Sequence, residues 1–168
     1  MGFNPRMAHP TAPKRLSLLY QLYLTNQAAR RFMRLALEGA GMSGEEYALY
    51  SYLYSNGPRT LTQAARDFGL PITTLATLLG PLIEAGEIAR QPHPTDRRSR
   101  LLALTNAGRD RLETAMPGFT VAYRALLAQL GERDVDSEAV FAALDELRGA
   151  IGRTGDLLEA EHQGIALD

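Results

Sequence analysis

The amino-acid sequence predicts a mainly α-helical protein with one small β-hairpin. Long segments in both halves of the chain repeat apolar residues at helical spacings of 4 and 3. Between them, residues 87–104 hold two short apolar runs separated by an arginine-rich loop, which is the pattern of a hairpin. The 168 residues, 45% hydrophobic and 22% charged, are typical of one folded domain with helical extensions.

The N-terminal part is expected to hold an arm and a long helix. Residues 1–14 include Pro5, Pro10 and Pro13 and are predicted to be a disordered arm. A helix is predicted over residues 14–38, where one stripe of side chains recurs at helical spacing. The stripe consists of Leu18, Leu22, Thr25, Ala29, Phe32 and Ala36.

A second helix is marked at both of its ends. Ser43 followed by Glu46 is the pattern of a capping box, in which each side chain accepts a hydrogen bond from the backbone N–H of the other residue. The helix is expected to end at Asn56, Gly57 and Pro58, because glycine closes helices and proline rarely continues them.

Two shorter helices joined by a tight turn are predicted next. The first covers residues 61–68, with Thr60 or Thr62 near its cap. Gly69 makes the turn, because glycine tolerates positive φ. The second helix covers residues 72–85.

Two strands are predicted at residues 87–91 and 100–104, with residues 92–99 as a long loop. With the two preceding helices they form the pattern of a winged helix-turn-helix. Such a unit places its second helix in a DNA major groove and directs the hairpin toward the backbone or the minor groove. Residues 58–105 are therefore predicted to be a DNA-binding domain.

Two long helices complete the chain. Thr105 is expected to cap the first, and Pro117 is expected to kink that helix without ending it, since the apolar stripe keeps its phase. The last helix is predicted from Asp136, although three glycines weaken it. The stripe of the first helix consists of Leu112, Met116, Phe119, Tyr123, Leu126 and Leu130.

The flanking helical regions, residues 15–57 and 106–165, carry apolar stripes wider than the small winged unit alone can cover. One explanation is a helical cap folded onto the same chain. The other is an intertwined homodimer, in which the stripes of two copies pack together. We favour the homodimer, and we interpret both regions as a dimerisation region.

Several classes of protein are disfavoured by the sequence. Without cysteine there are no disulfides and no thiolate metal ligands, and His9, His93 and His162 are too scattered to suggest a metal site. We find no nucleophile elbow, phosphate-binding glycine loop or acid–base pair, so neither an enzyme nor a cofactor is expected. No transmembrane or signal segment is visible, which favours a cytoplasmic protein with no membrane partner.

The net charge of −1 hides an uneven distribution. Residues 59–111 hold eight basic and five acidic side chains, whereas residues 132–168 hold three and ten. A near-neutral total therefore does not exclude DNA binding, because what matters is whether the basic residues share one face. The acidic C-terminal part is expected to lie away from phosphates.

Four arginines lie on the predicted hairpin: Arg90, Arg97, Arg98 and Arg100. Arginine keeps its charge at all relevant pH values, and its planar group matches phosphate oxygens or the edges of a narrow minor groove. These arginines are therefore predicted to contact DNA. The alternative is a solvated turn that only keeps the protein soluble.

The predicted major-groove helix offers few polar side chains. Threonine can donate to phosphates, and its methyl group can touch a thymine methyl. Leucines on the opposite side are expected to form the core face: Leu75, Leu78, Leu79 and Leu82. The threonines predicted to contact DNA are Thr62, Thr73, Thr74 and Thr77.

The hairpin sequence GEIAR, followed by DRRSRLLALT and by Gly108, resembles the wing of the MarR family of bacterial transcriptional regulators. The resemblance covers residues 42–108 by motif and the rest of the chain by helix layout. It implies that Arg98 reaches the minor groove. It also implies that Asp96 braces a wing arginine by a charge-assisted hydrogen bond, and that the protein is a homodimer.

The chain departs from that family at Gly80 and Pro81, where MarR recognition helices usually carry a basic or polar pair. Pro81 removes the hydrogen bond to the carbonyl of Thr77 and is expected to bend the helix. No Arg or Lys lies between Pro71 and Glu87. Bidentate recognition of guanine by this helix is therefore not expected, and sequence discrimination should be modest.

The resemblance further implies a pocket for small aromatic or phenolic effectors, between the dimer helices and the winged unit. Arg30 and Arg34 could meet a carboxylate there, and the alternatives are pairing with Glu38 or exposure to solvent. Six tyrosines are candidates for the pocket lining, although they could equally be ordinary core and interface aromatics. They are Tyr20, Tyr23, Tyr47, Tyr50, Tyr54 and Tyr123.

The sequence therefore predicts a cytoplasmic, homodimeric transcriptional repressor that binds double-stranded DNA and is released by an effector. The operator is expected to be pseudo-palindromic, with half-site centres about one helical turn apart. The alternative is a winged-helix protein-interaction module without sequence-specific DNA binding, which the recognition helix without basic residues favours.

Overall fold

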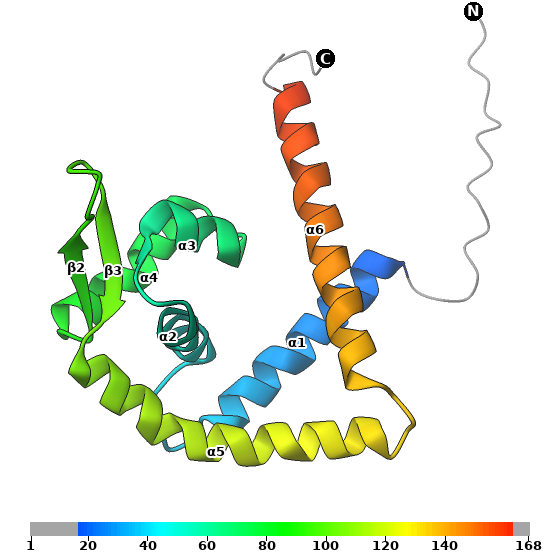
Figure 1. Ribbon diagram of the computed structural model, residues 1–168. Coiled ribbons are helices and arrows are strands. Elements are labelled where there is room, and N and C mark those ends of the chain that lie inside the picture. Colours follow the sequence, from blue (N-terminus) through cyan, green and yellow to red (C-terminus); the bar gives the residue numbers. More distant parts are fainter. Residues whose placement is uncertain (1–16, 163–168) are drawn as a thin grey trace, which may run out of the picture.

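Six helices and a small sheet make up the computed structural model, which describes residues 17–162 (Figure 1). The predicted arm, residues 1–14, lies outside the described residues. The predicted fold class is confirmed: the chain is mainly α-helical with one hairpin. The elements are α1 (Leu18–Ala36), α2 (Gly44–Asn56), β1 (Arg59–Thr60), α3 (Leu61–Phe68), α4 (Ile72–Glu84), β2 (Ile88–Pro92), β3 (Arg100–Leu104), α5 (Asn106–Gly131) and α6 (Ser137–His162).

Local hydrogen bonds account for the helix boundaries. Ser43 and Glu46 form the predicted capping box at the start of α2, with the Ser43 N–H donating to Glu46 Oε2 over 2.6 Å. Thr60 and Gln63 form a second capping box at the start of α3, so Thr60 and not Thr62 is the cap. Gly69 ends α3 in the left-handed conformation with a φ of 62°, as predicted.

The sheet has one strand more than the sequence predicts. β1 pairs antiparallel with β3 and gives the strand order β1-β3-β2. A strand of two residues is too short to show alternating hydrophobicity, so its position depends on its partner and not on its own sequence. β3 has the predicted bounds, and β2 begins and ends one residue later than predicted.

The hydrophobic core lies between α2, α4, the sheet and the first turns of α5. Tyr50 and Leu49 of α2 are fully buried there, together with Leu112 of α5. α4 buries the predicted leucine face: Leu75, Leu79 and Leu82 are buried, and Leu78 packs against them at the edge. This packing fixes the outer face of α4 and the direction in which the hairpin leaves the body.

The two C-terminal helices do not end at the proline and glycines within them. α5 continues through Pro117, as predicted, and α6 continues through Gly149, Gly152 and Gly155. α1 and α6 bury no side chain within this chain. In Figure 1, α5 runs from the hairpin to the opposite end of the molecule, where α6 turns back past α1. Over residues 17–162, no helix combines the length and apolar character needed to cross a membrane.

Candidate nucleic-acid interface

The outer face of α4 is exposed to solvent and carries no charged side chain before Glu84. Thr73, Thr74 and Thr77 are exposed on the side of the helix opposite the buried leucines. The Thr77 hydroxyl donates to the Thr73 carbonyl oxygen over 3.0 Å, within the same helix. Thr62, predicted to contact DNA from α3, is exposed as well.

Pro81 lies inside α4 and does not end the helix. Its carbonyl oxygen accepts from the Ala85 N–H over 2.9 Å, so the last turn is intact. Because proline has no N–H, the carbonyl of Thr77 has no helical donor at this point. The preceding Gly80 leaves open space where other residues would place a side chain. The C-terminal half of the helix therefore offers no side chain for reading a base until Glu84.

The hairpin carries the four predicted arginines, Arg90, Arg97, Arg98 and Arg100, all of them exposed. Arg100 is the most restrained, since its Nη1 donates to the carbonyl oxygens of Arg97 and Ser99 over 3.3 and 3.2 Å. The other three guanidinium groups make no hydrogen bond to the residues that the structure describes. They are free to bind an anionic surface.

Asp96 braces the hairpin loop through the backbone. Its Oδ1 accepts from the Arg98 N–H over 2.9 Å, and its Oδ2 accepts from the Ser99 hydroxyl over 2.5 Å. The Ser99 hydroxyl and the Arg98 N–H hold the pKa of the Asp96 carboxyl below its ordinary value, because both bonds favour the ionised form. The expected bond to an arginine side chain is thus replaced by bonds to the backbone and to a hydroxyl, which orient Arg98 through its main chain.

His93 provides a second brace that sequence reasoning missed. Its Nδ1 lies 3.1 Å from the Asp96 N–H and 3.3 Å from the Thr95 N–H, and it accepts from both. An acceptor two and three residues before the amide donors is the pattern of an Asx turn, which is associated with Asp and Asn and not with His. The position of His93, two and three residues before Thr95 and Asp96, is the sequence feature that could have indicated this brace.

An ion-pair cluster fixes the base of the hairpin. Arg111 of α5 donates from Nη1 to both oxygens of Glu87, over 2.9 and 2.6 Å, and the Tyr50 hydroxyl also donates to Glu87. The Nη2 of Arg111 donates to the Gly41 carbonyl over 2.6 Å and lies 3.6 Å from Glu46. Burial raises the pKa of the Tyr50 hydroxyl, and the hydrogen bond to Glu87 raises it further. The cluster ties the hairpin to α5 and to the start of α2.

Two curated proteins with similar sequences are both named as transcriptional regulators. No family model matches the chain. The HTH-type transcriptional repressor YetL of Bacillus subtilis is 24% identical over 123 residues, 72% of this chain and 74% of YetL. The transcriptional activatory protein BadR of Rhodopseudomonas palustris is 27% identical over 148 residues, 82% of this chain and 84% of BadR.

Solved structures agree more closely in shape than in sequence. Wild-type MarR from E. coli superposes with a TM-score of 0.61 at 18% identity, over 82% of this chain and 98% of MarR. The transcriptional repressor CouR, solved bound to a 23-mer DNA duplex, gives 0.68 at 23% identity, over 79% of this chain and 92% of CouR. The chain has the MarR fold.

Within the MarR fold, the candidate tyrosines lie in separate places. Tyr47 is buried with its ring centre 4.4 Å from that of Phe119, and Tyr123 stacks on the same Phe119 at 5.9 Å. Tyr50 is fully buried and belongs to the ion-pair cluster. Tyr20 and Tyr23 stack on each other on exposed α1, and Tyr54 is exposed below Arg109.

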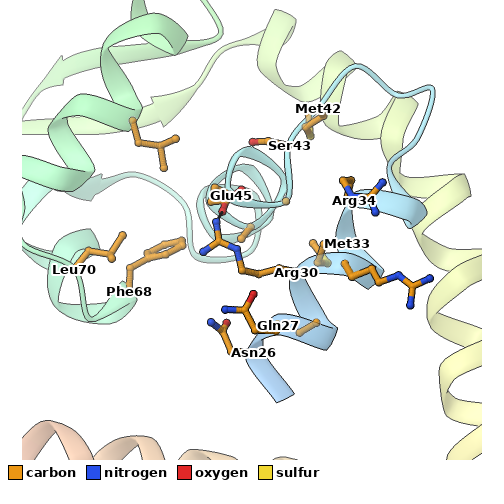
Figure 2. A pocket seen from close by; sticks show the side chains of 15 residues that line it. Asn26, Gln27, Arg30, Met33, Arg34, Met42, Ser43, Glu45, Phe68 and Leu70 are labelled. Atoms are coloured by element: carbon orange, nitrogen blue, oxygen red, sulfur yellow. Dashed lines mark hydrogen bonds and ion pairs between the residues drawn. The ribbon is translucent and has the colours of Figure 1, made fainter. Parts of the chain in front are cut away.

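A cavity of about 730 Å³ lies instead between α1, α2 and the α3–α4 segment of the MarR fold (Figure 2). Arg30 is one of its lining residues and reaches from α1 to pair with Glu45 of α2 over 2.7 Å, not with Glu38. Both partners keep more than half of their side-chain surface exposed, at 65% and 53%. None of the six candidate tyrosines lines this cavity. Its lining includes Asn26, Gln27, Met33, Arg34, Met42, Phe68, Leu70 and Leu78.

Proposed function

We propose that the chain is a DNA-binding transcriptional regulator of the MarR type, acting on chromosomal DNA in the cytoplasm. The observation that carries this proposal is the shared exposure of the α4 threonines and the hairpin arginines on a MarR fold. The helix would enter the major groove, and Arg98 would reach the adjoining minor groove or backbone. CouR, which has the same fold, is bound to DNA in its solved structure.

The proposed active form is a homodimer. α1, α5 and α6 expose large apolar side chains that a monomer leaves in water, among them Leu19 at 66%, Val121 at 70% and Leu158 at 51%. Packing these faces against a second copy would remove them from water. Twofold symmetry would then present two α4 helices to successive major grooves, about 34 Å apart on the duplex.

Repression is the proposed outcome of binding. YetL and CouR are named as repressors, and BadR is named as an activatory protein. Repression needs only the contacts described above, because a dimer bound across promoter DNA excludes other proteins from it. Activation would need an additional surface for the transcription machinery.

The decisive measurement is binding of the purified protein to the DNA upstream of its own gene, against a random duplex of equal length, over a salt series. We expect preference for the upstream DNA and a loss of affinity of roughly a thousandfold between about 50 and 200 mM salt, as multiple phosphate contacts require. Equal, weak and salt-independent binding to both duplexes would contradict the proposal. It would favour the protein-interaction module instead.

The cavity beside Arg30 is the proposed effector site, in place of the scattered tyrosines. An aromatic carboxylate fits it by chemistry: methionine, leucine and phenylalanine side chains surround the ring, and Arg30 can exchange Glu45 for the ligand carboxylate. The exchange would remove the ion pair that links α1 to α2. A ligand that favours the non-binding arrangement by about 1–3 kcal/mol is sufficient to regulate the protein.

Calorimetric titration with benzoate and phenol tests the effector site. We expect benzoate to bind, Arg30→Ala to weaken it roughly tenfold, and Glu45→Gln to strengthen it by freeing Arg30. Phenol, which lacks the carboxylate, should respond to neither substitution. Benzoate binding that is unchanged in both variants would exclude Arg30 as the anchor.

A further inference from the structure

The recognition helix lacks every side chain that forms paired hydrogen bonds with a base. Its sequence, ITTLATLLGPLIE, contains no Arg, Lys, Asn or Gln. Arg and Lys are the side chains that pair with the O6 and N7 of guanine, and Asn and Gln are those that pair with adenine. Sequence recognition by α4 must therefore use another feature of the major groove.

The neighbouring helix does not supply the missing amide. The side-chain Oε1 of Gln63 in α3 accepts from the Thr60 N–H over 3.0 Å, and the backbone N–H of Gln63 donates to the Thr60 hydroxyl. Paired contact of both its Oε1 and its Nε2 with an adenine would turn the oxygen away from the Thr60 N–H and so break the capping box that begins α3. Its role is to start the helix.

Exposed methyl groups are the apolar feature that α4 offers to a partner. Thr73 and Thr77 lie one turn apart at the centre of the exposed face, and the Thr77 hydroxyl is turned back onto the Thr73 carbonyl. That bond uses the hydroxyl hydrogen inside the helix and leaves the γ-methyl for an outside partner. Ile72, in the first turn, keeps 48% of its surface exposed although it is fully apolar.

We propose that α4 recognises the C5-methyl groups of thymine, with Thr77 and Ile72 as the contacting side chains. The proposal rests on the proposed DNA-binding function and adds the chemistry of the ligand: duplex DNA with thymines at the major-groove positions of each half-site. Only thymine among the four bases carries a methyl group in the major groove. Contact between apolar groups needs no paired hydrogen bonds, which suits the side chains that α4 provides.

Uracil substitution isolates this contact. We would select the tightest duplex from a random pool with the full-length protein at low salt, and then replace its thymines by uracil one at a time. This change removes only the methyl group and leaves the minor-groove edge intact. At contacted thymines we expect about a fourfold loss of affinity, the value for one buried methyl group, and about fifteenfold when both half-sites are changed.

Two matched variants assign the contact to a residue. Thr77→Ser keeps the hydroxyl and removes the methyl, so it should abolish the uracil effect at the thymine that Thr77 touches. Thr77→Val keeps the methyl and removes the hydroxyl, so it should preserve the effect. Ile72→Ala should abolish the effect at a second thymine.

The outcomes separate this inference from the function on which it rests. Salt-dependent duplex binding with no effect of uracil at any thymine would overturn the inference and leave the function standing. A uracil effect that survives both Thr77→Ser and Ile72→Ala would overturn the assignment to these two residues. Absence of binding to any selected duplex would overturn the proposed function itself.

Discussion

Arg98→Ala is expected to weaken binding to promoter DNA roughly tenfold and to lower the slope of log affinity against log salt by about 1. The Arg98 backbone is fixed by Asp96, and its guanidinium group is exposed and makes no hydrogen bond to the described part of the chain. Loss of this permanent charge removes one contact to DNA without disturbing the core. Fluorescence anisotropy over a salt series measures both quantities.

Arg148→Ala is the matched control, because it removes the same charge from α6, a helix that lies apart from the hairpin in Figure 1 and on which Arg148 pairs with Asp145. It should leave the salt slope unchanged. Asp96→Ala should cost less affinity than Arg98→Ala, since it loosens the loop without removing a positive charge. A larger loss for Asp96→Ala, or an unchanged slope for Arg98→Ala, would refute the roles assigned here.

The stabilisation of the hairpin loop by Asp96 depends on pH, because only the ionised carboxylate accepts both hydrogen bonds. Because its folded-state pKa lies below the ordinary value of 3.8, the ionised form is the one that the loop stabilises. The stabilisation is complete above that ordinary value and disappears only as pH falls through the lowered pKa. DNA binding should therefore show no contribution from Asp96 titration near neutral pH.

Gly108→Ala is expected to destabilise the fold by about 3 kcal/mol, which corresponds to a decrease of roughly 10 °C in Tm. An added Cβ would overlap the Glu87 carbonyl oxygen and lie 3.0 Å from Leu104 Cδ2. The Glu87 carbonyl cannot retreat easily, because it accepts from the Thr105 N–H over 3.1 Å. Thermal unfolding followed by circular dichroism measures the change.

Gly80→Ala is the control for this effect. It lies in the interior of α4, and an added Cβ would meet no atom of another element within 4 Å, although Pro81 follows it directly. Alanine there should change the stability by less than about 1 kcal/mol, because the gain from reduced backbone freedom is opposed by the restriction that Pro81 places on the residue before it. Equal melting temperatures for the two variants would show that α5 does not pack on the start of β2 as closely as described.

The features that could be predicted from the sequence are those with local causes. The capping box of Ser43 and Glu46 depends on residues three positions apart, and Gly69 closes α3 by its own conformational freedom. The core face of α4 follows from its leucine spacing. These signals fixed most helix boundaries to within a few residues and identified the hairpin.

The features that could not be predicted depend on contacts distant in sequence. Glu87 and Arg111 are 24 positions apart, and nothing near either residue indicates the other. For Tyr50 the sequence leaves a pocket lining and an ordinary core position open, and nothing local indicates that its hydroxyl reaches Glu87, 37 positions away. β1 exists only because β3 lies beside it.

Positive charge and sequence recognition lie on different elements of this protein. The hairpin carries the arginines, and α4 carries none. If the proposed function is correct, the hairpin would set how often the protein collides with and slides along any duplex, and α4 would set the sequence at which it stops. Raising the salt concentration should lower affinity for all sequences by a similar factor and leave the ratio between a preferred and a random site nearly constant.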